Sequence, residues 1–400
     1  NFWVYLVRSV TRILLPLSTV LALLLIFDGT PMTLEGKQTI TTLEGSQQTI
    51  SQGPVAAVVA IKQLGTNGGG FFGANSSHPL ENPTYFTNMV ECISIMLIPM
   101  AMIWALGFYL KKRKFAICIF SVMLTAYLVG VFISVNQEMG GNHNIEQMGI
   151  AQNMGSMEGK ETRFGSAATA LWAMTTTATS NGSVNGMHDS VTPITGALAM
   201  LNMQINCWFG GVGVGFMNYY IFIIIAVFLS GLMVGRTPEF MGKKIEAREM
   251  KIAIIITLLH PFLILCSTAL SSYIAHSNPV IAAAWLNNPS FHGLSEMLYE
   301  FTSSAANNGS GFEGLSDNTP FWNISTGVVM IISRYMPIIG QVAIVGLLAQ
   351  KKYIPTSAGT LQTDTVTFSV MTFIVIFIIA ALAFFPVLTL GPIAEFLTIN

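Results

Sequence analysis

The chain has 400 residues, of which 52% are apolar and only 9% are charged. An ordinary soluble domain carries about 25% charged residues, so this composition argues against a soluble fold and for an integral membrane protein. The 18 Lys and Arg residues nearly balance the 19 Asp and Glu residues, which leaves no basic surface for nucleic acid. Four cysteines without CxxC spacing argue against a disulfide scaffold or a zinc site: Cys92, Cys118, Cys207 and Cys266.

Seven apolar stretches are long enough to cross a bilayer, which requires about 20 residues per helix. The fourth and the sixth are long enough to be bent or broken. The sequence therefore predicts an all-α membrane fold with about seven spanning helices. In chain order the stretches are 4–27, 89–110, 115–135, 197–234, 252–275, 322–349 and 366–390.

The positive charges predict the orientation of these helices, because cytoplasmic loops are enriched in Lys and Arg. The long segments between alternate helices carry only Lys37, Lys62, Lys160 and Arg163, and we expect them to face outward. One cation, Arg334, falls inside an apolar stretch. The cations expected on the inner side are Arg8, Arg12, Lys111, Lys112, Arg113, Lys114, Arg236, Lys243, Lys244, Arg248, Lys251, Lys351 and Lys352.

Each outward segment contains a short helix-compatible stretch, at 54–64, 165–177 and 292–306, followed by a polar, Gly-rich turn. An Asn-Gly pair occurs in every turn, so that helix, short helix, loop and helix form an internal repeat. Non-helical backbone is tolerated at membrane depth only where it is buried in protein or lines a water-filled cavity. We therefore expect three re-entrant pore helices whose loops line a cavity.

Loops of this kind can select potassium, because rings of backbone carbonyls replace the hydration shell of the ion and Gly supplies conformational freedom. The turns contain no carboxylate, which argues against a calcium-type site. A fourfold filter needs four loops and this sequence supplies three. We expect the fourth upstream of Asn1 or in another chain.

The same turns have a simpler interpretation. Asn75, Asn181, Asn308 and Asn323 all match the glycosylation pattern, so that the turns could be plain surface loops. Their three equivalent positions in a repeated frame favour the pore-loop interpretation.

A Gly-rich run at 210–215 lacks both the preceding strand and the Lys-Ser/Thr ending of a nucleotide-binding loop. It is expected to break the fourth apolar stretch below the second loop and to act as a gate, with close helix packing as the alternative. Arg334 is costly in lipid and should face the interior beside the ion path. There its charge would oppose passage to the cytoplasm, unless it forms a structural ion pair.

His188 and Asp189 follow the second loop and invite a proton-relay or metal hypothesis. No further His or carboxylate stands at ligand spacing, and the six His residues form no cluster in the sequence. We therefore expect them to form a loop-stabilising hydrogen bond.

Short motifs characteristic of one family occur along the sequence, at 1–4, 65–72, 74–76, 78–79, 187–190, 209–213, 235–239 and 306–310. With these motifs, the sequence resembles the potassium-binding A subunit of Kdp-type potassium-transporting ATPases from residue 1 to about 395. This resemblance implies the fold of the superfamily of potassium transporters, which has four pore repeats. The chain resembles the last three, at 1–112, 113–245 and 246–352, with a C-terminal spanning helix at 353–400.

The resemblance implies a potassium-binding and translocating subunit of a high-affinity, ATP-driven uptake complex in a bacterial inner membrane. It also implies assembly with an ATP-hydrolysing B subunit, a C subunit and a small F subunit. The sequence has no aspartyl-phosphate motif or Walker loop, so we expect K⁺ as the transported ion and no ATP bound by this chain. The alternatives are a Trk- or Ktr-like transporter driven by ion gradients and a non-functional truncated remnant.

The resemblance also implies roles for individual residues. Arg334 would lie near an intersubunit tunnel, and Gly210, Gly211 and Gly213 would belong to the gate. One departure is that Asn206-Cys207 replaces an expected Gly-Glu pair. The implied filter residues are Thr66, Asn67, Gly68, Gly69, Thr179, Ser180, Asn181, Gly182, Asn307, Asn308, Gly309 and Ser310.

Overall fold

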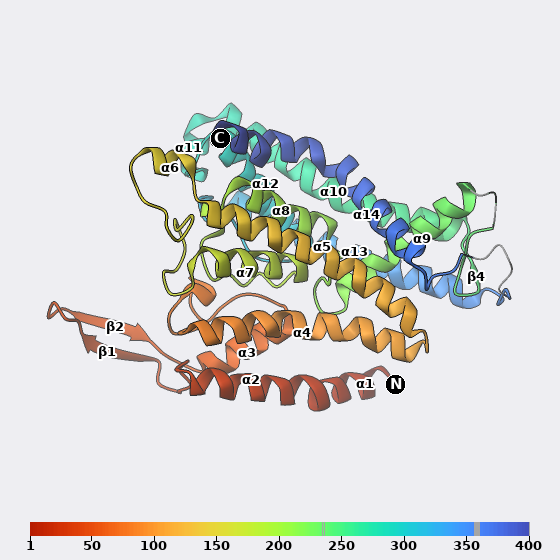
Figure 1. Cartoon of the computed structure of the whole chain (residues 1–400), viewed down its shortest axis with the longest axis horizontal. Helices are drawn as coiled ribbons and strands as arrows, with labels where there is room; N and C mark the ends of the chain where they lie inside the picture. The colour runs from red at the N-terminus through yellow and green to blue at the C-terminus, as the bar shows by residue number, and fades with distance from the viewer. Residues whose placement is uncertain (234, 236, 356–360, 400) are drawn as a thin grey trace.

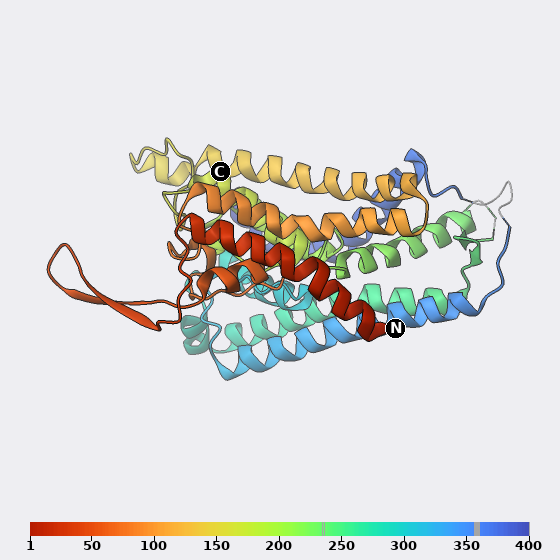
Figure 2. The ribbon, with the colours of Figure 1, turned by 90° about the horizontal axis from the view of Figure 1, so that it is seen from below.

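The computed structural model describes residues 1–233, 235, 237–355 and 361–399, so that Arg236, assigned to the inner side, lies outside the described residues. Within this part of the chain, seven helices are long and apolar enough to cross a membrane. Figures 1 and 2 show them running along the long axis of the molecule. The predicted all-α membrane fold is confirmed. The spans are Phe2–Phe27, Tyr85–Tyr109, Arg113–Gln147, Val214–Met233, Ala247–Ser277, Pro320–Gln350 and Val366–Ile399.

The first group of elements follows the predicted order of long helix, short helix, loop and long helix. The first long helix is continuous through a π-helical turn, η1, and Pro16, which lies in the helix interior, follows just after this turn. The elements are α1 (Phe2–Ser9), η1 (Val10–Leu14), α2 (Leu15–Phe27), α3 (Val55–Gly65), η2 (Asn75–Ser77) and α4 (Tyr85–Tyr109).

The order recurs twice more and is followed by one further span. The second group is α5 (Arg113–Gly140), α6 (His143–Gln147), α7 (Gly165–Thr179), η3 (His188–Ser190), α8 (Pro193–Ile205) and α9 (Val214–Met233). The third is α10 (Ala247–Ser277), α11 (Pro279–Trp285), α12 (Phe291–Ala306) and α13 (Pro320–Gln350), before α14 (Val366–Leu388), η4 (Thr389–Ile393) and α15 (Ala394–Ile399).

The three short helices α3, α7 and α12 coincide with the predicted stretches to within two residues at each end. They lie among the long helices, and most of their residues are buried. Helix α7 contains only uncharged residues and so has no charged face to present to water, whereas α12 also carries His292, Glu296 and Glu300.

The fourth apolar stretch is broken, whereas the sixth is not. Helix α8 ends at Ile205 and α9 begins at Val214, so the break falls at the Gly-rich run, as expected. Helix α13 continues unbroken over 31 residues although it contains Pro337.

Two small antiparallel sheets were not predicted from the sequence. Strands β1 (Lys37–Thr41) and β2 (Gln47–Ser51) form a hairpin whose residues are almost all exposed, and Figures 1 and 2 show it projecting from one end of the molecule. Strands β3 (Glu239–Phe240) and β4 (Lys243–Lys244) pair at the opposite end. Each hairpin is too short to need an apolar face, so neither leaves a clear sequence pattern.

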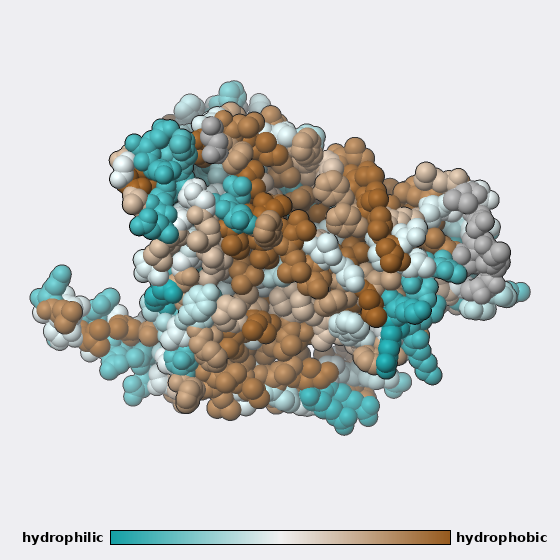
Figure 3. Space-filling view, in the orientation of Figure 1, coloured by the Kyte–Doolittle hydropathy of each residue, from teal (hydrophilic) through white to brown (hydrophobic). Residues whose placement is uncertain are grey.

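The surface divides in the way that a lipid environment requires. Figure 3 shows apolar residues over the middle of the molecule and hydrophilic residues gathered toward its ends. Large apolar side chains on the long helices are exposed, for example Phe132 and Leu382, which are 70% and 79% exposed. An apolar surface of this extent marks a membrane-contacting face rather than a soluble one.

Two cations on the segments expected to face outward are buried in ion pairs. Lys62 pairs with Glu81 at 2.7 Å, and Lys160 pairs with Glu138 at 2.9 Å. All four side chains are at most 2% exposed. This burial was not predicted from the sequence, and the paired carboxylate makes it possible because it replaces part of the hydration that the lysine loses.

Candidate functional site

Helices α3, α7 and α12 all end at the same cavity. The residues that follow them, Thr66, Ser180 and Asn307, have positive φ angles of 47°, 54° and 53°. All three line one cavity of about 250 Å³. The last carbonyls of a helix have no intrahelical partner and carry partial negative charge, so three converging C-termini favour a cation.

The loops that follow these helices pack directly against one another. A methyl group on Gly68 would overlap the carbonyl oxygen of Asn181, and a methyl group on Gly182 would overlap that of Asn308. The φ angles of the two glycines are 59° and 86°, a region that other residues rarely adopt. The three loops therefore form a series: Gly68 of the first loop faces a carbonyl of the second loop, and Gly182 of the second loop faces a carbonyl of the third.

The series ends at Gly309. Its φ angle is 104°, yet among the described residues no atom lies within 4 Å of the position that a methyl group would take. At the other end of the series, the side chain of Asn67 is exposed, unlike those of Asn181 and Asn308. The arrangement is closed between neighbouring loops and open between the third loop and the first.

The Asn side chains connect the loops to the short helices. Asn181 and Asn308 each accept a hydrogen bond from the backbone N–H two residues later, at 2.8 and 3.0 Å. The amide of Asn308 also donates to the carbonyl of Thr176, at 2.8 Å. Asn181 and Asn308 are 0% and 3% exposed, so the glycosylation interpretation is wrong at these two positions.

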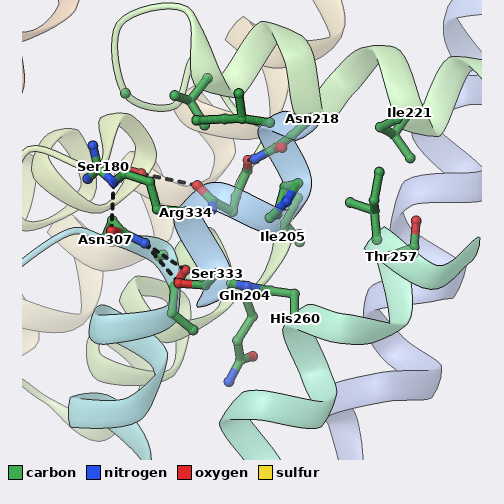
Figure 4. Close-up of a pocket in the computed structure, with 18 of the residues that line it drawn as sticks. Ser180, Gln204, Ile205, Asn218, Ile221, Thr257, His260, Asn307, Ser333 and Arg334 are labelled. Carbon is green, nitrogen blue, oxygen red and sulfur yellow. Dashed lines mark hydrogen bonds between the residues drawn. The ribbon is translucent and has the colours of Figure 1, made fainter. Parts of the chain in front are cut away.

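On the cavity side, each loop is tied to the element beneath it. The hydroxyl of Thr66 accepts from the N–H of Val212 at 3.0 Å, and the hydroxyl of Ser180 donates to the side chain of Asn206 at 3.1 Å. Asn307 accepts from the Nε of Arg334 at 2.8 Å (Figure 4). The first two loops are therefore held by the break between α8 and α9, and the third by α13.

The Gly-rich break lies directly below the second loop. The N–H of Gly210 donates to the carbonyl of Ala178 at 2.8 Å, and a methyl group on Gly211 would lie 3.8 Å from Ser180. Gly213 has a φ angle of 86°. The predicted position of this segment is thus observed, while its role as a gate stays a prediction.

Asn206 and Cys207, the departure noted in the sequence, begin this break. Asn206 adopts a φ angle of 48°, a conformation that Asn tolerates better than most residues after Gly. Cys207 is fully buried in the core. Asn206 therefore preserves the turn expected of a glycine, while the second position is apolar rather than acidic.

Arg334 lines the cavity, as expected from the cost of placing it in lipid. Within the described ranges it forms no ion pair, and its Nε donates to Asn307 instead. This arrangement disfavours the structural ion-pair interpretation. It leaves the guanidinium charge beside the cavity below the three loops.

A buried polar network behind α3 was missed from the sequence. Lys62 donates to Glu81, to Asn75 at 2.7 Å and to Ser76 at 2.8 Å. The neighbouring Gln63 donates to Glu91 at 2.7 Å and to Ser183 of the second loop at 3.1 Å. No periodic pattern could have found this network, because its members come from α3, η2, α4 and the second loop.

His188 behaves as predicted, but Asp189 does not. The ring of His188 is hydrogen-bonded to the hydroxyl of Tyr299 at 2.9 Å, which in turn contacts Ser310 at 2.9 Å. Burial lowers the pKa of His188 to about 4, so the ring is neutral at physiological pH. Asp189 lies beside His292 and Glu296, so the expectation that no further His or carboxylate joins it was wrong.

Within the described residues, seven apolar helices and three short helices that end at one cavity define a multi-pass membrane protein. The chain belongs to the family of potassium-transporting ATPase A subunits, which it matches over residues 1–397. The family resemblance seen in the motifs is confirmed.

The relatives carry the same description. The chain is 69% identical to the potassium-transporting ATPase potassium-binding subunits of Phocaeicola vulgatus and Bacteroides fragilis. It is 51% identical to the protein of that name from Geobacillus kaustophilus. Each alignment covers the whole of this chain, 71% of the first two proteins and 70% of the third.

The Lys62–Glu81 pair generates a first prediction. Replacing Lys62 by Met should lower the free energy of unfolding by about 3–5 kcal/mol, because Glu81 then stays buried without its cation. The double variant Lys62→Met/Glu81→Gln should recover most of this loss. Thermal unfolding in detergent measures the stability of the two variants. An equal loss of stability in the single and the double variant would contradict a buried Lys62–Glu81 ion pair.

Proposed function

We propose that this chain is the potassium-binding and translocating subunit of an ATP-driven uptake complex, and that backbone carbonyls of its three loops select the ion. The observation that carries the proposal is the series of glycines facing carbonyls at the ends of three helices. Carbonyl oxygens and helix C-termini suit a dehydrated monovalent cation, and the loops hold no carboxylate. Relatives described as potassium-binding subunits support K⁺ as that cation.

The proposed filter comprises the segment after each short helix. Each segment begins at or next to the left-handed residue that follows its helix and continues through the Asn-Gly pair. This geometry turns the chain back on itself at the end of the helix. The residues are Thr66, Asn67, Gly68 and Gly69 in the first loop; Thr179, Ser180, Asn181 and Gly182 in the second; and Asn307, Asn308, Gly309 and Ser310 in the third.

A fourth loop completes the filter in this proposal. It would supply the carbonyl that Gly309 lacks and cover the side chain of Asn67. Gly182 and Gly309 both have a positive φ angle, and at Gly182 the carbonyl of a neighbouring loop fills the adjacent space. The corresponding space beside Gly309 is unfilled among the described residues, and this difference supports a fourth loop. The fourth loop belongs either to another segment of the protein or to another chain.

Below the filter, Gly210, Gly211 and Gly213 form the proposed gate and Arg334 a barrier. Both are tied to the filter by hydrogen bonds, and both line or border the cavity. A fixed positive charge there opposes direct passage of K⁺ to the cytoplasm. The ion would instead leave sideways, toward a partner subunit.

The partner in this proposal is an ATP-hydrolysing B subunit, accompanied by C and F subunits. The relatives' description as one subunit of a transporting ATPase supports a multi-subunit assembly. ATP is then hydrolysed on the partner, and this chain contributes the ion path. The family match favours this pump over a Trk- or Ktr-like transporter driven by gradients alone.

Gly182 tests the filter. Gly182→Ala should raise the apparent KM for K⁺ uptake by tenfold or more, because the new methyl group displaces the carbonyl of Asn308. Gly149→Ala is the matched control: Gly149 also has a positive φ angle, 81°, but it lies outside the three loops and no described atom lies within 4 Å of the added methyl group. The filter assignment fails if both variants shift KM equally or if neither does.

Gly309 tests the fourth loop separately. If another loop faces this residue in the assembled transporter, Gly309→Ala should raise the KM for K⁺ as strongly as Gly182→Ala. The measurement is K⁺-dependent uptake in cells that express the complete complex. A KM shift no larger than that of Gly149→Ala would show that no carbonyl faces Gly309.

Arg334 tests the barrier. Arg334→Gln should increase passive K⁺ flux through the reconstituted complex in the absence of ATP, by tenfold or more, since the charge below the filter is removed. Arg334→Lys keeps the positive charge, so its passive K⁺ flux should stay at the level of the wild type. Flux through the Gln variant that matches the wild type would contradict the barrier role.

A further inference from the structure

A cluster of metal-ligating side chains lies away from the filter, at the end of the molecule that carries α6, α11 and the C-terminus. Asp189 comes from η3, after the second loop, and His292 and Glu296 are one turn apart at the start of α12. Each residue offers one ligand atom, and the three atoms lie within 4.8 Å of one another. Residues more than 100 positions apart in the chain thus present a nitrogen and two carboxylates at one point.

Among the described residues, the hydrogen bonds in this cluster leave one ligand atom without a partner, Oε2 of Glu296. The amide of Asn288 donates to Oδ2 of Asp189 at 3.3 Å and to Oε1 of Glu296 at 3.2 Å. The other oxygen of Glu296, Oε2, is buried without a hydrogen-bond partner, and the whole residue is 0% exposed. A buried carboxylate oxygen left unpaired is costly, and a cation would satisfy it.

The histidine ring lies between two carboxylates, and a metal ion would take the place of the proton between its Nε2 and Asp189. Its Nδ1 lies 2.8 Å from Oε1 of Glu395 in α15, and its Nε2 lies 2.9 Å from Oδ1 of Asp189. In metal sites the second ring nitrogen is usually held by such a carboxylate, which fixes the tautomer and directs the other nitrogen at the metal. Glu395 would take this supporting position.

An ion can reach the cluster. Asp189 and His292 line a cavity of about 350 Å³, together with Asn288 and Glu395. Polar side chains from the loop before α7, among them Glu158, line the same cavity. A hydrated cation therefore finds space next to the ligand atoms.

We propose that Asp189, His292 and Glu296 bind a divalent transition-metal ion of the Zn²⁺ class. One imidazole with two carboxylates matches the nitrogen and oxygen donors of such ions, whereas Ca²⁺ and Mg²⁺ prefer oxygen alone. Metal–ligand bonds of about 2.0–2.2 Å place ligand atoms about 3.4 Å apart, so small side-chain rotations close the site.

The bound ion would connect two of the three helix–loop groups. Asp189 follows the second loop, while His292 and Glu296 lie on the short helix that leads into the third. The ion would therefore fix the second and third loops relative to each other from behind. This role does not depend on which ion passes through the filter.

The test uses the protein purified in detergent with the subunits that accompany it, stripped with EDTA and titrated with ZnCl₂ by calorimetry. One Zn²⁺ per chain should bind, and an excess of Ca²⁺ or Mg²⁺ should not displace it. Asp189→Asn and His292→Gln should each weaken binding by 10–100-fold. His143→Gln, in an exposed residue that lines the same cavity, is the matched control and should bind as the wild type does.

Equal Zn²⁺ affinity in the wild type and the ligand variants would overturn the proposal, as would the absence of binding to the wild type. In that second case the cluster is an ion triad held together by a proton. X-ray absorption of the zinc-loaded wild type gives a reading that does not rely on variants folding. It should show one nitrogen donor with oxygen donors, and sulfur or several imidazoles would contradict the site.

Discussion

The structure depends on three helices that end inside the protein. The last carbonyls of a helix have no partner within it, and in a membrane no bulk water is present to satisfy them. Here the chain reverses at each of these ends through a left-handed residue, Thr66, Ser180 or Asn307, and all three border one cavity. Some of these carbonyls are paired within the protein, as that of Ala178 is with Gly210 and that of Thr176 with Asn308. The partial negative charge of the three helix ends still favours a cation in the cavity.

No loop is held by its own sequence alone. Gly68 is shaped by the backbone of the second loop and Gly182 by that of the third, while Asn308 reaches back to the end of α7. Because each loop packs against the next, the spacing of the carbonyls is a property of the assembled series. The buried Lys62–Glu81 pair extends this dependence outward, since it fixes α3 against the segment that follows the first loop.

The three loops and the elements below them share hydrogen bonds. Thr66 and Ser180 are bonded to the break between α8 and α9, and Asn307 is bonded to Arg334 of α13. A movement of the break or of α13 would therefore alter the same residues that end the short helices. In the proposed transport cycle, a movement of the gate or the barrier would therefore shift residues of the proposed ion-binding site.

The sequence by itself determined the membrane class, the long helices and the positions of α3, α7 and α12, because apolar length and the repeated Asn-Gly turns are local properties of the chain. It also located the break at 210–215, since clustered glycines interrupt an apolar helix. The family followed from the motifs.

Only the tertiary structure decided which groups meet. Periodicity cannot show that Lys62 is buried against Glu81, that Gly309 differs from Gly68 and Gly182, or that Asp189 lies beside His292. Several of these facts depend on contacts between segments that are more than 100 residues apart in the chain. Local pattern fixes what each segment is, whereas packing in three dimensions fixes which segments become neighbours.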